Sequence, residues 1–237
     1  MNGWFITGTD TDAGKTALTA CLLAALHHRG HATLPMKPAQ TGCQQTIPDL
    51  DYALHLSGIH ADPNLRNLMA PARYQPACSP HLAAEIEQRP LTLEQLTHAY
   101  QTLRPHAPTL LVEGAGGVLV PLNRQHTMLD LMHALQLPIL IAARPGLGTI
   151  NHTLLTINAL QQRHLTITGF VFVHTTPDAT DFTESDNAQT IAHFSNIPFL
   201  GTLPYTPQLD TPTPPPFSTL PHSLQETLIT LTQKLIP

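Results

Sequence analysis

The chain has 237 residues, a length that suits one domain of ordinary size. Its 42% hydrophobic content is enough for a packed core, and its formal net charge of −5 at pH 7 argues against a nucleic-acid groove or an anionic membrane surface as the main partner. Cys21, Cys43 and Cys78 form no Cys-x-x-Cys pair, which argues against a disulfide framework or a thiolate zinc site.

The first residues, from Met1 to Thr7, lack the basic segment and the long apolar stretch of a signal peptide. No stretch of the sequence approaches the roughly 18 consecutive apolar residues of a membrane span. We therefore expect a cytoplasmic protein that acts on neither nucleic acid nor membranes.

Short apolar runs alternate with amphipathic stretches, a pattern typical of a parallel sheet covered by helices on both faces. The first strand is predicted at residues 4–7 and the first helix at residues 15–29, with Gly30 as its stop. We find no repeat and no linker, so a single α/β domain over residues 1–237 is expected. Further strands are predicted at residues 32–36, 109–113, 137–143, 165–173 and 197–203, and further helices at 150–162, 186–194 and 223–236.

The segment from Pro204 to Pro221 is rich in Pro and Thr, including three consecutive prolines at residues 214–216. Proline excludes a regular helix or a central strand there. We therefore interpret residues 204–221 as an extended surface segment within the domain.

A glycine-rich loop from Gly8 to Thr16 lies between the first predicted strand and the first predicted helix. In this context glycines let backbone N–H groups surround phosphate oxygens, and the start of the helix favours an anion. Lys15 would neutralise the β- and γ-phosphates, and the Thr16 hydroxyl would bind Mg²⁺. The alternative is a glycine turn before an ordinary helix.

This loop is one residue longer between its two glycines than the usual phosphate-binding loop, and it is acidic. Asp10 and Asp12 would repel a polyphosphate unless they face a metal ion or an ammonium group. The loop therefore favours a substrate that carries amines. Alternatively, both carboxylates cap backbone N–H groups.

Three further positions follow predicted strands or begin predicted helices. Lys37 comes at the carboxyl end of the second strand, the edge where open α/β sheets bind ligands, although a lone lysine is often only solvated surface. Asp49 and Asp51 either cap a helix that starts near Tyr52 or supply a carboxylate to Mg²⁺.

Glu113 ends a predicted apolar strand, the position of an acid that lies near Mg²⁺ in phosphate-loop proteins, and a glycine-rich run follows it. Asn151 and His152 open a predicted helix. The N–H groups of that helix would receive a carboxylate, or Asn151 is a simple cap.

Taken together, these motifs resemble the dethiobiotin synthetase family, in the same order along most of the chain. The match thins after Val173. The matching segments are Thr7 to Thr11 with Gly14 to Thr16, Lys37-Pro38, Asp51 with Ala53-Leu54, Ser79 to His81, Glu113 to Gly117 with Pro121-Leu122, and Asn151-His152 with Leu155-Thr156.

The resemblance implies a P-loop NTPase-like fold and a homodimer with its sites at the subunit interface. It also implies an ATP- and Mg²⁺-dependent ligase of biotin biosynthesis. Such an enzyme would carboxylate an amine of diaminopelargonate with CO₂, phosphorylate the carbamate with ATP and close the ureido ring.

The resemblance further implies the roles of individual residues. Lys15, Lys37 and Thr11 would be catalytic. Thr11 and Thr41 would face the diamine, and Asn151 of the partner subunit would receive the carboxylate tail. Mg²⁺ would be held by Thr16, Asp51 and Glu113. The nucleotide and its metal would contact Asp12, Ala13, Gly14, Lys15, Thr16, Ala17, Asp51, Glu113, Gly114, Ala115, Gly116, Val173, His174, Pro204, Tyr205 and Thr206.

Some positions depart from the family pattern. Val173 and His174 stand where many members have an Asn-Asp-type pair that reads adenine, and a Val side chain has no hydrogen-bonding group. We therefore expect loose base selectivity, or recognition through backbone groups near Tyr205, with Asp210 a weaker candidate for the ribose. Asp12 replaces a frequent Glu, and Thr41 replaces a frequent Ser.

Two other classes share such a loop. A partition-type P-loop ATPase switch would begin its loop with Lys-Gly-Gly, whereas this chain has Asp10 at the Lys position. A corrin-amide synthetase would carry a glutaminase domain with a catalytic Cys, for which these residues leave no room.

Overall fold

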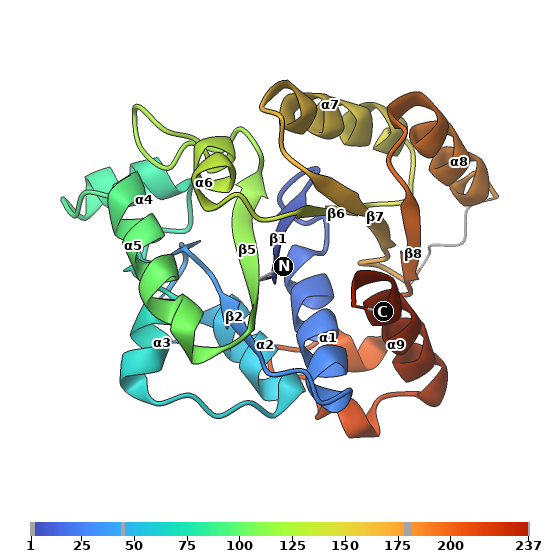
Figure 1. Cartoon of the computed structure of the whole chain (residues 1–237), viewed down its shortest axis with the longest axis horizontal. Coiled ribbons are helices and arrows are strands. Elements are labelled where there is room, and N and C mark those ends of the chain that lie inside the picture. Colours follow the sequence, from blue (N-terminus) through green and yellow to red (C-terminus); the bar gives the residue numbers. More distant parts are fainter. Residues whose placement is uncertain (1–2, 44–45, 178–181, 237) are drawn as a thin grey trace.

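One parallel sheet of six strands organises the molecule (Figure 1). The coordinates, a computed structural model, describe residues 3–43, 46–177 and 182–236. The strand order is β2-β5-β1-β6-β7-β8, and a small second sheet pairs β3 with β4. The strands are β1 (Gly3–Gly8), β2 (Thr33–Met36), β3 (Ala39–Gln40), β4 (Ala72–Arg73), β5 (Thr109–Gly117), β6 (Ile139–Ala143), β7 (Ile167–Val173) and β8 (Phe199–Leu203).

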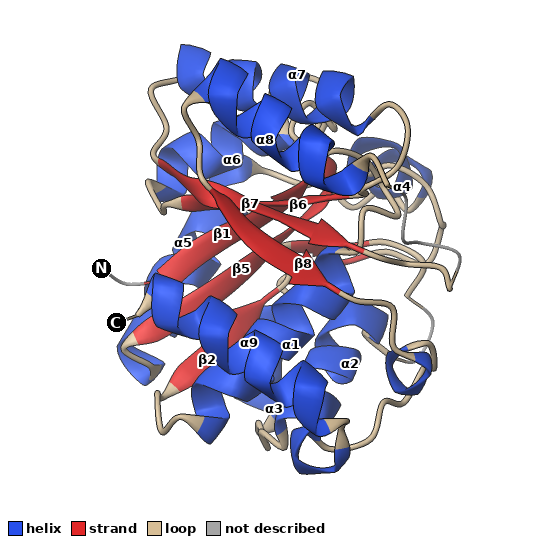
Figure 2. Ribbon diagram, turned by 90° about the vertical axis from the view of Figure 1, so that its right-hand side faces the viewer, coloured by secondary structure: helices blue, strands red, loops and turns tan. Residues whose placement is uncertain are grey.

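Helices cover both faces of the sheet (Figure 2). They are α1 (Lys15–His28), α2 (Pro48–Ser57), α3 (Pro63–Met69), α4 (Pro80–Ile86), α5 (Leu93–Leu103), α6 (Met128–Leu135), α7 (Thr149–Gln162), α8 (Glu184–Ser195) and α9 (His222–Leu235). Short 3₁₀ turns are η1 (Arg104–His106), η2 (Pro207–Leu209) and η3 (Phe217–Thr219). Among the described residues, no helix has the length and apolar character that a membrane crossing requires.

The alternating side chains of β1 divide the core into two layers. Trp4 and Ile6 pack in one cluster with α1 and α9, whereas Phe5 packs in the other with α5, α6 and α7. This alternation is the period of two that a strand imposes. Because both faces of β1 are buried, its sequence reads as one short apolar run.

The expected α/β class is confirmed, and each predicted strand and helix has a counterpart in the structure. Their ends differ by one or two residues, except that β5 continues to Gly117. The helix expected near Tyr52 already begins at Pro48, because proline is favoured in the first turn of a helix.

The Pro-rich segment 204–221 is not wholly a surface segment, which corrects the expectation from the sequence. It contains η2 and η3, and Phe217 and Leu220 are buried in the cluster that α1 and α9 share. These two apolar side chains anchor the segment to the core.

Candidate active site

The loop between β1 and α1 lies at the carboxyl edge of the sheet, next to the central strands. Gly14 begins α1 with a φ of 81°, a left-handed conformation that strains any other residue. A Cβ atom there would clash with Val173 Cγ1, so the close approach of β7 also requires glycine. Local chain geometry and packing therefore demand the same residue.

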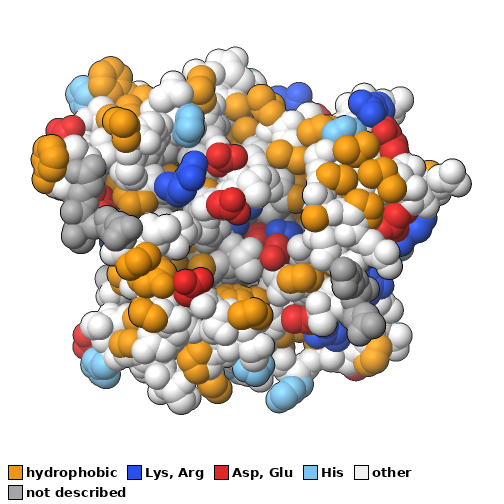
Figure 3. All heavy atoms as spheres, turned by 180° about the vertical axis from the view of Figure 1, so that it is seen from behind, with side chains coloured by type: hydrophobic (Ala, Val, Ile, Leu, Met, Phe, Trp, Pro, Cys, Tyr) orange, Lys and Arg blue, Asp and Glu red, His pale blue; other side chains and the backbone are white. Residues whose placement is uncertain are grey.

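Lys15 and Lys37 converge on one cavity of about 450 Å³ at this edge. Figure 3 looks onto the edge and shows acidic and basic side chains inside a hollow. The predicted residues Thr11, Asp12, Gly14, Thr16, Ala17, Thr41, Glu113, Ala115 and Gly116 also line the cavity, together with Gln40, Asp49 and Thr175. The structure therefore gathers residues from five separate stretches of the chain: 11–17, 37–41, 49, 113–116 and 175.

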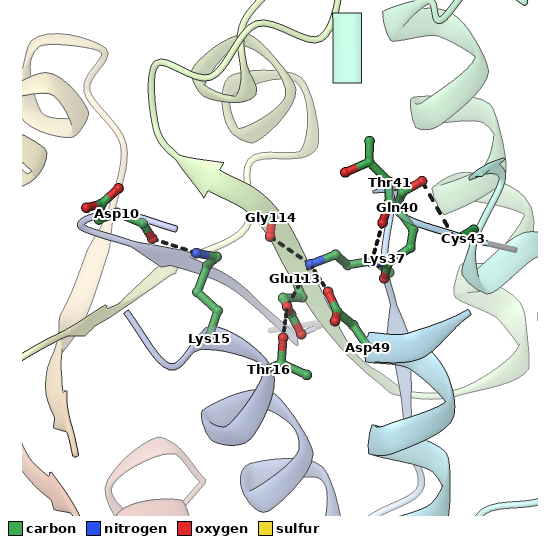
Figure 4. A network of polar contacts seen from close by, with 10 residues as sticks. All are labelled: Asp10, Lys15, Thr16, Lys37, Gln40, Thr41, Cys43, Asp49, Glu113 and Gly114. Atoms are coloured by element: carbon green, nitrogen blue, oxygen red, sulfur yellow. Dashed lines mark hydrogen bonds and ion pairs between the residues drawn. The ribbon is translucent and has the colours of Figure 1, made fainter. Parts of the chain in front are cut away.

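Lys37 is buried between two carboxylates (Figure 4). Its Nζ lies 2.7 Å from Glu113 Oε1 and 2.6 Å from Asp49 Oδ2, and it donates a hydrogen bond of 3.1 Å to the Gly114 carbonyl. Burial by itself lowers the pKa of Lys37, but Glu113 and Asp49 outweigh it, and the pKa rises above its usual value. Lys37 is therefore a fixed positive charge.

Lys15 has the opposite balance. Burial lowers its pKa below the usual value, and the positive charge of Lys37 lowers it further. Its Nζ donates a 2.7 Å hydrogen bond to the Asp10 backbone oxygen (Figure 4). An anion bound between the two ammonium groups would relieve this repulsion, as expected of a phosphate-binding lysine.

Three oxygen-bearing side chains meet beside Lys37. The Thr16 hydroxyl donates a 2.8 Å hydrogen bond to Glu113 Oε1, and Asp49 lies across the Lys37 ammonium from Glu113 (Figure 4). A hydroxyl and two carboxylates are hard ligands of the kind that Mg²⁺ prefers, with nucleotide phosphates and waters completing the shell. The donor set therefore fits Mg²⁺.

Asp51, which the sequence predicted as a Mg²⁺ ligand, lies outside the residues that line this cavity. Its carboxylate accepts from the Arg66 guanidinium and from the Ile47 N–H, the latter at 2.8 Å. Because residues two apart point to opposite sides of a helix, only one of Asp49 and Asp51 can face Lys37. The structure brings Asp49 to the site and leaves Asp51 as a cap for α2.

A second cavity of about 160 Å³ adjoins the first, and Ala17 lines both. His174 is held there by Glu184, whose Oε2 lies 2.9 Å from His174 Nε2, and Tyr205 donates to Asp210 at 3.0 Å. The predicted nucleotide residues Val173, His174, Pro204, Tyr205 and Thr206 all line this cavity, with Leu209 and Asp210.

Asn151 is exposed in the first turn of α7 and is not among the residues that line the cavity of Lys15 and Lys37. Its neighbour His152 lines a cavity of about 400 Å³ with Thr9 and Arg144 on the other side of the phosphate loop. Arg144 Nη2 lies 3.4 Å from Asp10 Oδ2, a contact that the sequence alone did not indicate. Its position directly after the carboxyl end of a predicted strand could have indicated that Arg144 lies near the site.

A phosphate loop at the end of the first strand of a parallel sheet, with a lysine and an acid from neighbouring strands, defines a P-loop nucleotide-binding protein. The septum site-determining protein MinD complexed with Mg-ADP from Pyrococcus horikoshii has this fold, with a TM-score of 0.64 at 14% identity over 99% of this chain and 96% of that chain. A ParA family ATPase from Chlorobium tepidum matches with a TM-score of 0.62 at 14% identity, over 100% of both chains.

Sequence comparison narrows the class. A family profile described as an AAA domain matches residues 2–213. The ATP-dependent dethiobiotin synthetase BioD of Thermodesulfovibrio yellowstonii is 35% identical over 88% of this chain and 90% of the relative. The BioD protein of Anaeromyxobacter dehalogenans strain 2CP-1 is 37% identical over 88% of this chain and 92% of the relative. The BioD protein of Yersinia pestis bv. Antiqua is 36% identical over 87% of this chain and 86% of the relative. The chain belongs to the ATP-dependent dethiobiotin synthetase family, a family of ligases.

Proposed function

We propose that this protein is an ATP-dependent cyclo-ligase of biotin biosynthesis, which closes the ureido ring of dethiobiotin from diaminopelargonate and CO₂. The observation that carries the proposal is the convergence of Lys15 and Lys37 on one cavity with Thr16, Asp49 and Glu113. Membership of the dethiobiotin synthetase family supports the substrate class.

The reaction proceeds in three balanced steps. One amine of the substrate attacks CO₂ to form a carbamate and releases a proton. A carbamate oxygen then attacks the γ-phosphorus of ATP, forming a carbamic-phosphoric anhydride and ADP. The second amine attacks the carbonyl carbon, closes the ring and expels phosphate, and the proton that this amine loses goes to the released phosphate.

The two lysines act on the charge that moves in the second step. Lys15 neutralises the phosphates from the side of the loop, and Lys37 bridges the carbamate oxygen and the transferring phosphoryl group. Because Lys37 is already held by the buried Glu113 and the partly exposed Asp49, little reorganisation is needed when that charge develops. Thr11 and Thr41, which line the same cavity, face the diamine.

Mg²⁺ would be held by Thr16, Glu113 and Asp49 together with the nucleotide. When bound, it neutralises charge on the phosphates. Asp49 takes the place that the sequence assigned to Asp51. ATP is the substrate, and its base occupies the cavity that Val173, His174 and Tyr205 line.

The active form is a homodimer with Asn151 of the partner subunit receiving the substrate carboxylate at the start of α7. Exposed apolar side chains near the site support this arrangement. Leu119 is 65% exposed, Leu155 is 62% exposed, and both line a cavity of about 420 Å³ beside Asp10 and Thr11. A monomer rarely exposes such a patch without a partner.

Phosphate release tests the function directly. We expect release from ATP to require both the diamine and bicarbonate, and to fall to background when either is omitted. ATP turnover that is indifferent to the diamine would reject the proposal. That result would favour the partition-type ATPase switch, which acts by ATP-driven dimerisation.

A further inference from the structure

Tyr52 lines neither cavity of the site, but it links the helix that carries Asp49 of the first cavity to Leu209 of the second cavity. It lies on α2, and its hydroxyl donates a 2.8 Å hydrogen bond to the backbone oxygen of Leu209, a residue 157 positions further along the chain. Burial raises the pKa of this hydroxyl, and Cys21 and Asp210 raise it further. Tyr52 therefore stays protonated and remains a hydrogen-bond donor.

One end of this contact reaches the proposed metal and phosphate site. Asp49 precedes Tyr52 by three residues on α2, so the two side chains lie on neighbouring parts of the helix surface. Asp49 is the partner of Lys37 at 2.6 Å. A rotation or shift of the first turns of α2 therefore changes where the Asp49 carboxylate stands relative to Lys37 and Glu113.

The other end reaches the cavity proposed for the base. Leu209 and Asp210 both line it, and Tyr205 is tied to Asp210 by a 3.0 Å hydrogen bond. Between β8 and η3 the chain forms only the short turn η2, so the position of Leu209 and Asp210 depends on a few such contacts. Tyr52 and Leu209 also pack against the same core cluster as Ala17, which lines both cavities.

We propose that Tyr52 is a positioning residue that couples occupation of the base cavity to the placement of Asp49 beside Lys37. A base that contacts Leu209 and Asp210 restricts the motion of these residues. The hydrogen bond from Tyr52 to Leu209 then restricts the motion of α2 as well. The inference rests on the proposed function for the role of Asp49.

The test compares ADP, which carries a base, with pyrophosphate, which does not, each with Mg²⁺ and the full-length protein. Hydrogen–deuterium exchange is measured in the peptide that covers residues 48–57. We expect ADP to slow exchange there about fivefold more than saturating pyrophosphate, the effect of about one hydrogen bond. Equal protection by the two ligands in the unsubstituted protein overturns the proposal without any variant.

Tyr52→Phe then removes the single hydroxyl. We expect the protection by ADP to fall to the level given by pyrophosphate, while the Kd of ADP changes less than about threefold. Tyr74→Phe is the matched control, because Tyr74 also donates to a backbone oxygen, that of Arg89 at 3.1 Å. If Tyr52→Phe keeps the ADP-specific protection, or if Tyr74→Phe loses it equally, Tyr52 has no special role.

A kinetic readout separates coupling from loss of structure. With ATP, Tyr52→Phe should lower kcat severalfold at nearly constant KM. A rise in KM at unchanged kcat would place Tyr52 in simple binding of the base and overturn the coupling. The exchange experiment needs no diamine, so its result remains readable if diamine-dependent phosphate release is absent, and its failure leaves that reaction intact.

Discussion

At the scale of single residues, the site is decided by how buried charges are paired. Lys37 is 5% exposed and Glu113 is 3% exposed, so their ion pair is buried. The Lys37 ammonium has two further partners, the Asp49 carboxylate and the Gly114 carbonyl. A buried charge needs such partners, because desolvation costs several kcal/mol per ion in the interior. For Lys15, by contrast, burial and then the charge of Lys37 lower the pKa, and a bound phosphate would supply the counter-charge that favours its protonated form.

Replacing Lys37 tests whether it acts on developing charge. We expect Lys37→Ala to lower kcat about 100-fold or more, while the Kd of ADP changes less than about threefold, because the ammonium is needed mainly in the transition state. Steady-state kinetics and calorimetric titration with ADP provide the two values.

Lys234→Ala is the control, since Lys234 donates to the Leu200 backbone oxygen far from the phosphate loop in sequence. An equal loss of turnover and of ADP affinity in Lys37→Ala would count against the proposed role. Because Lys37→Ala leaves Glu113 and Asp49 without their cation, its folding is first checked by circular dichroism.

Asn substitutions at Asp49 and Asp51 separate the two acids of α2. We expect Asp49→Asn to raise the Mg²⁺ concentration for half-maximal turnover about tenfold, because a neutral amide is a weaker ligand for a hard cation. Asp51→Asn should leave the Mg²⁺ requirement unchanged. It should lower the melting temperature slightly, since the Asp51 carboxylate accepts hydrogen bonds from the Ile47 N–H and the Arg66 guanidinium. The reverse pattern would restore Asp51 as the metal ligand.

At the scale of elements, the ends of β7 and β8 decide how a base can be held. Val173 ends β7 with 1% exposure and packs closely against Gly14, and His174 is tied to Glu184. Val173 offers no side-chain hydrogen bond to a base edge. A base in the proposed cavity would therefore be read without this side chain, by shape and by backbone groups of the segment that follows β8.

This arrangement predicts weak discrimination among nucleoside triphosphates. We expect kcat/KM for ATP, CTP, GTP and UTP to lie within about tenfold of one another, because a missing bidentate contact removes about 1–3 kcal/mol of discrimination. The comparison uses diamine-dependent phosphate release at matched Mg²⁺. A strong preference for ATP would show that the base lies elsewhere or is read by other groups.

At the scale of the whole molecule, the strand order places the site. β1 lies between β5 and β6; the chain leaves β1 toward β2 on one side, whereas the later connection from β5 leads to β6 on the other side, so a crevice opens at the carboxyl edge where the loop after β1 lies. Glu113 from β5 and Lys37 after β2 reach that crevice from one side, and the ends of β7 and β8 line the cavity proposed for the base on the other. The exposed apolar residues Leu119 and Leu155 stand next to it.

The proposed homodimer is tested by charging this apolar surface. We expect Leu155→Glu to shift the protein from dimer to monomer in sedimentation and to lower turnover at least tenfold, because the partner subunit would no longer deliver Asn151. Phe194→Glu is the control, since Phe194 is an exposed apolar residue of α8. A fully active monomer would contradict the shared site.

Much of the fold followed from local patterns. Buried parallel strands give apolar runs, and the leucines of α1 recur with helical spacing, so β1, β5, β6, β7, β8 and α1 were predictable within one or two residues at most ends. The sequence offered weaker patterns for α3, α4 and α6, which are short helices of 7–8 residues. Short helices take most of their stability from tertiary packing rather than from their own sequence.

The amino-acid sequence was enough to predict the phosphate loop, its lysine and the order of the acidic and glycine-rich motifs, because these depend on backbone conformation over a few consecutive residues. Tertiary structure decided which of Asp49 and Asp51 meets Lys37, and it joined Tyr52 to Leu209. The first depends on how α2 is rotated about its axis, and the second on packing between segments far apart in the chain. Neither is encoded in local spacing, since both arise when separate elements bury their apolar faces together.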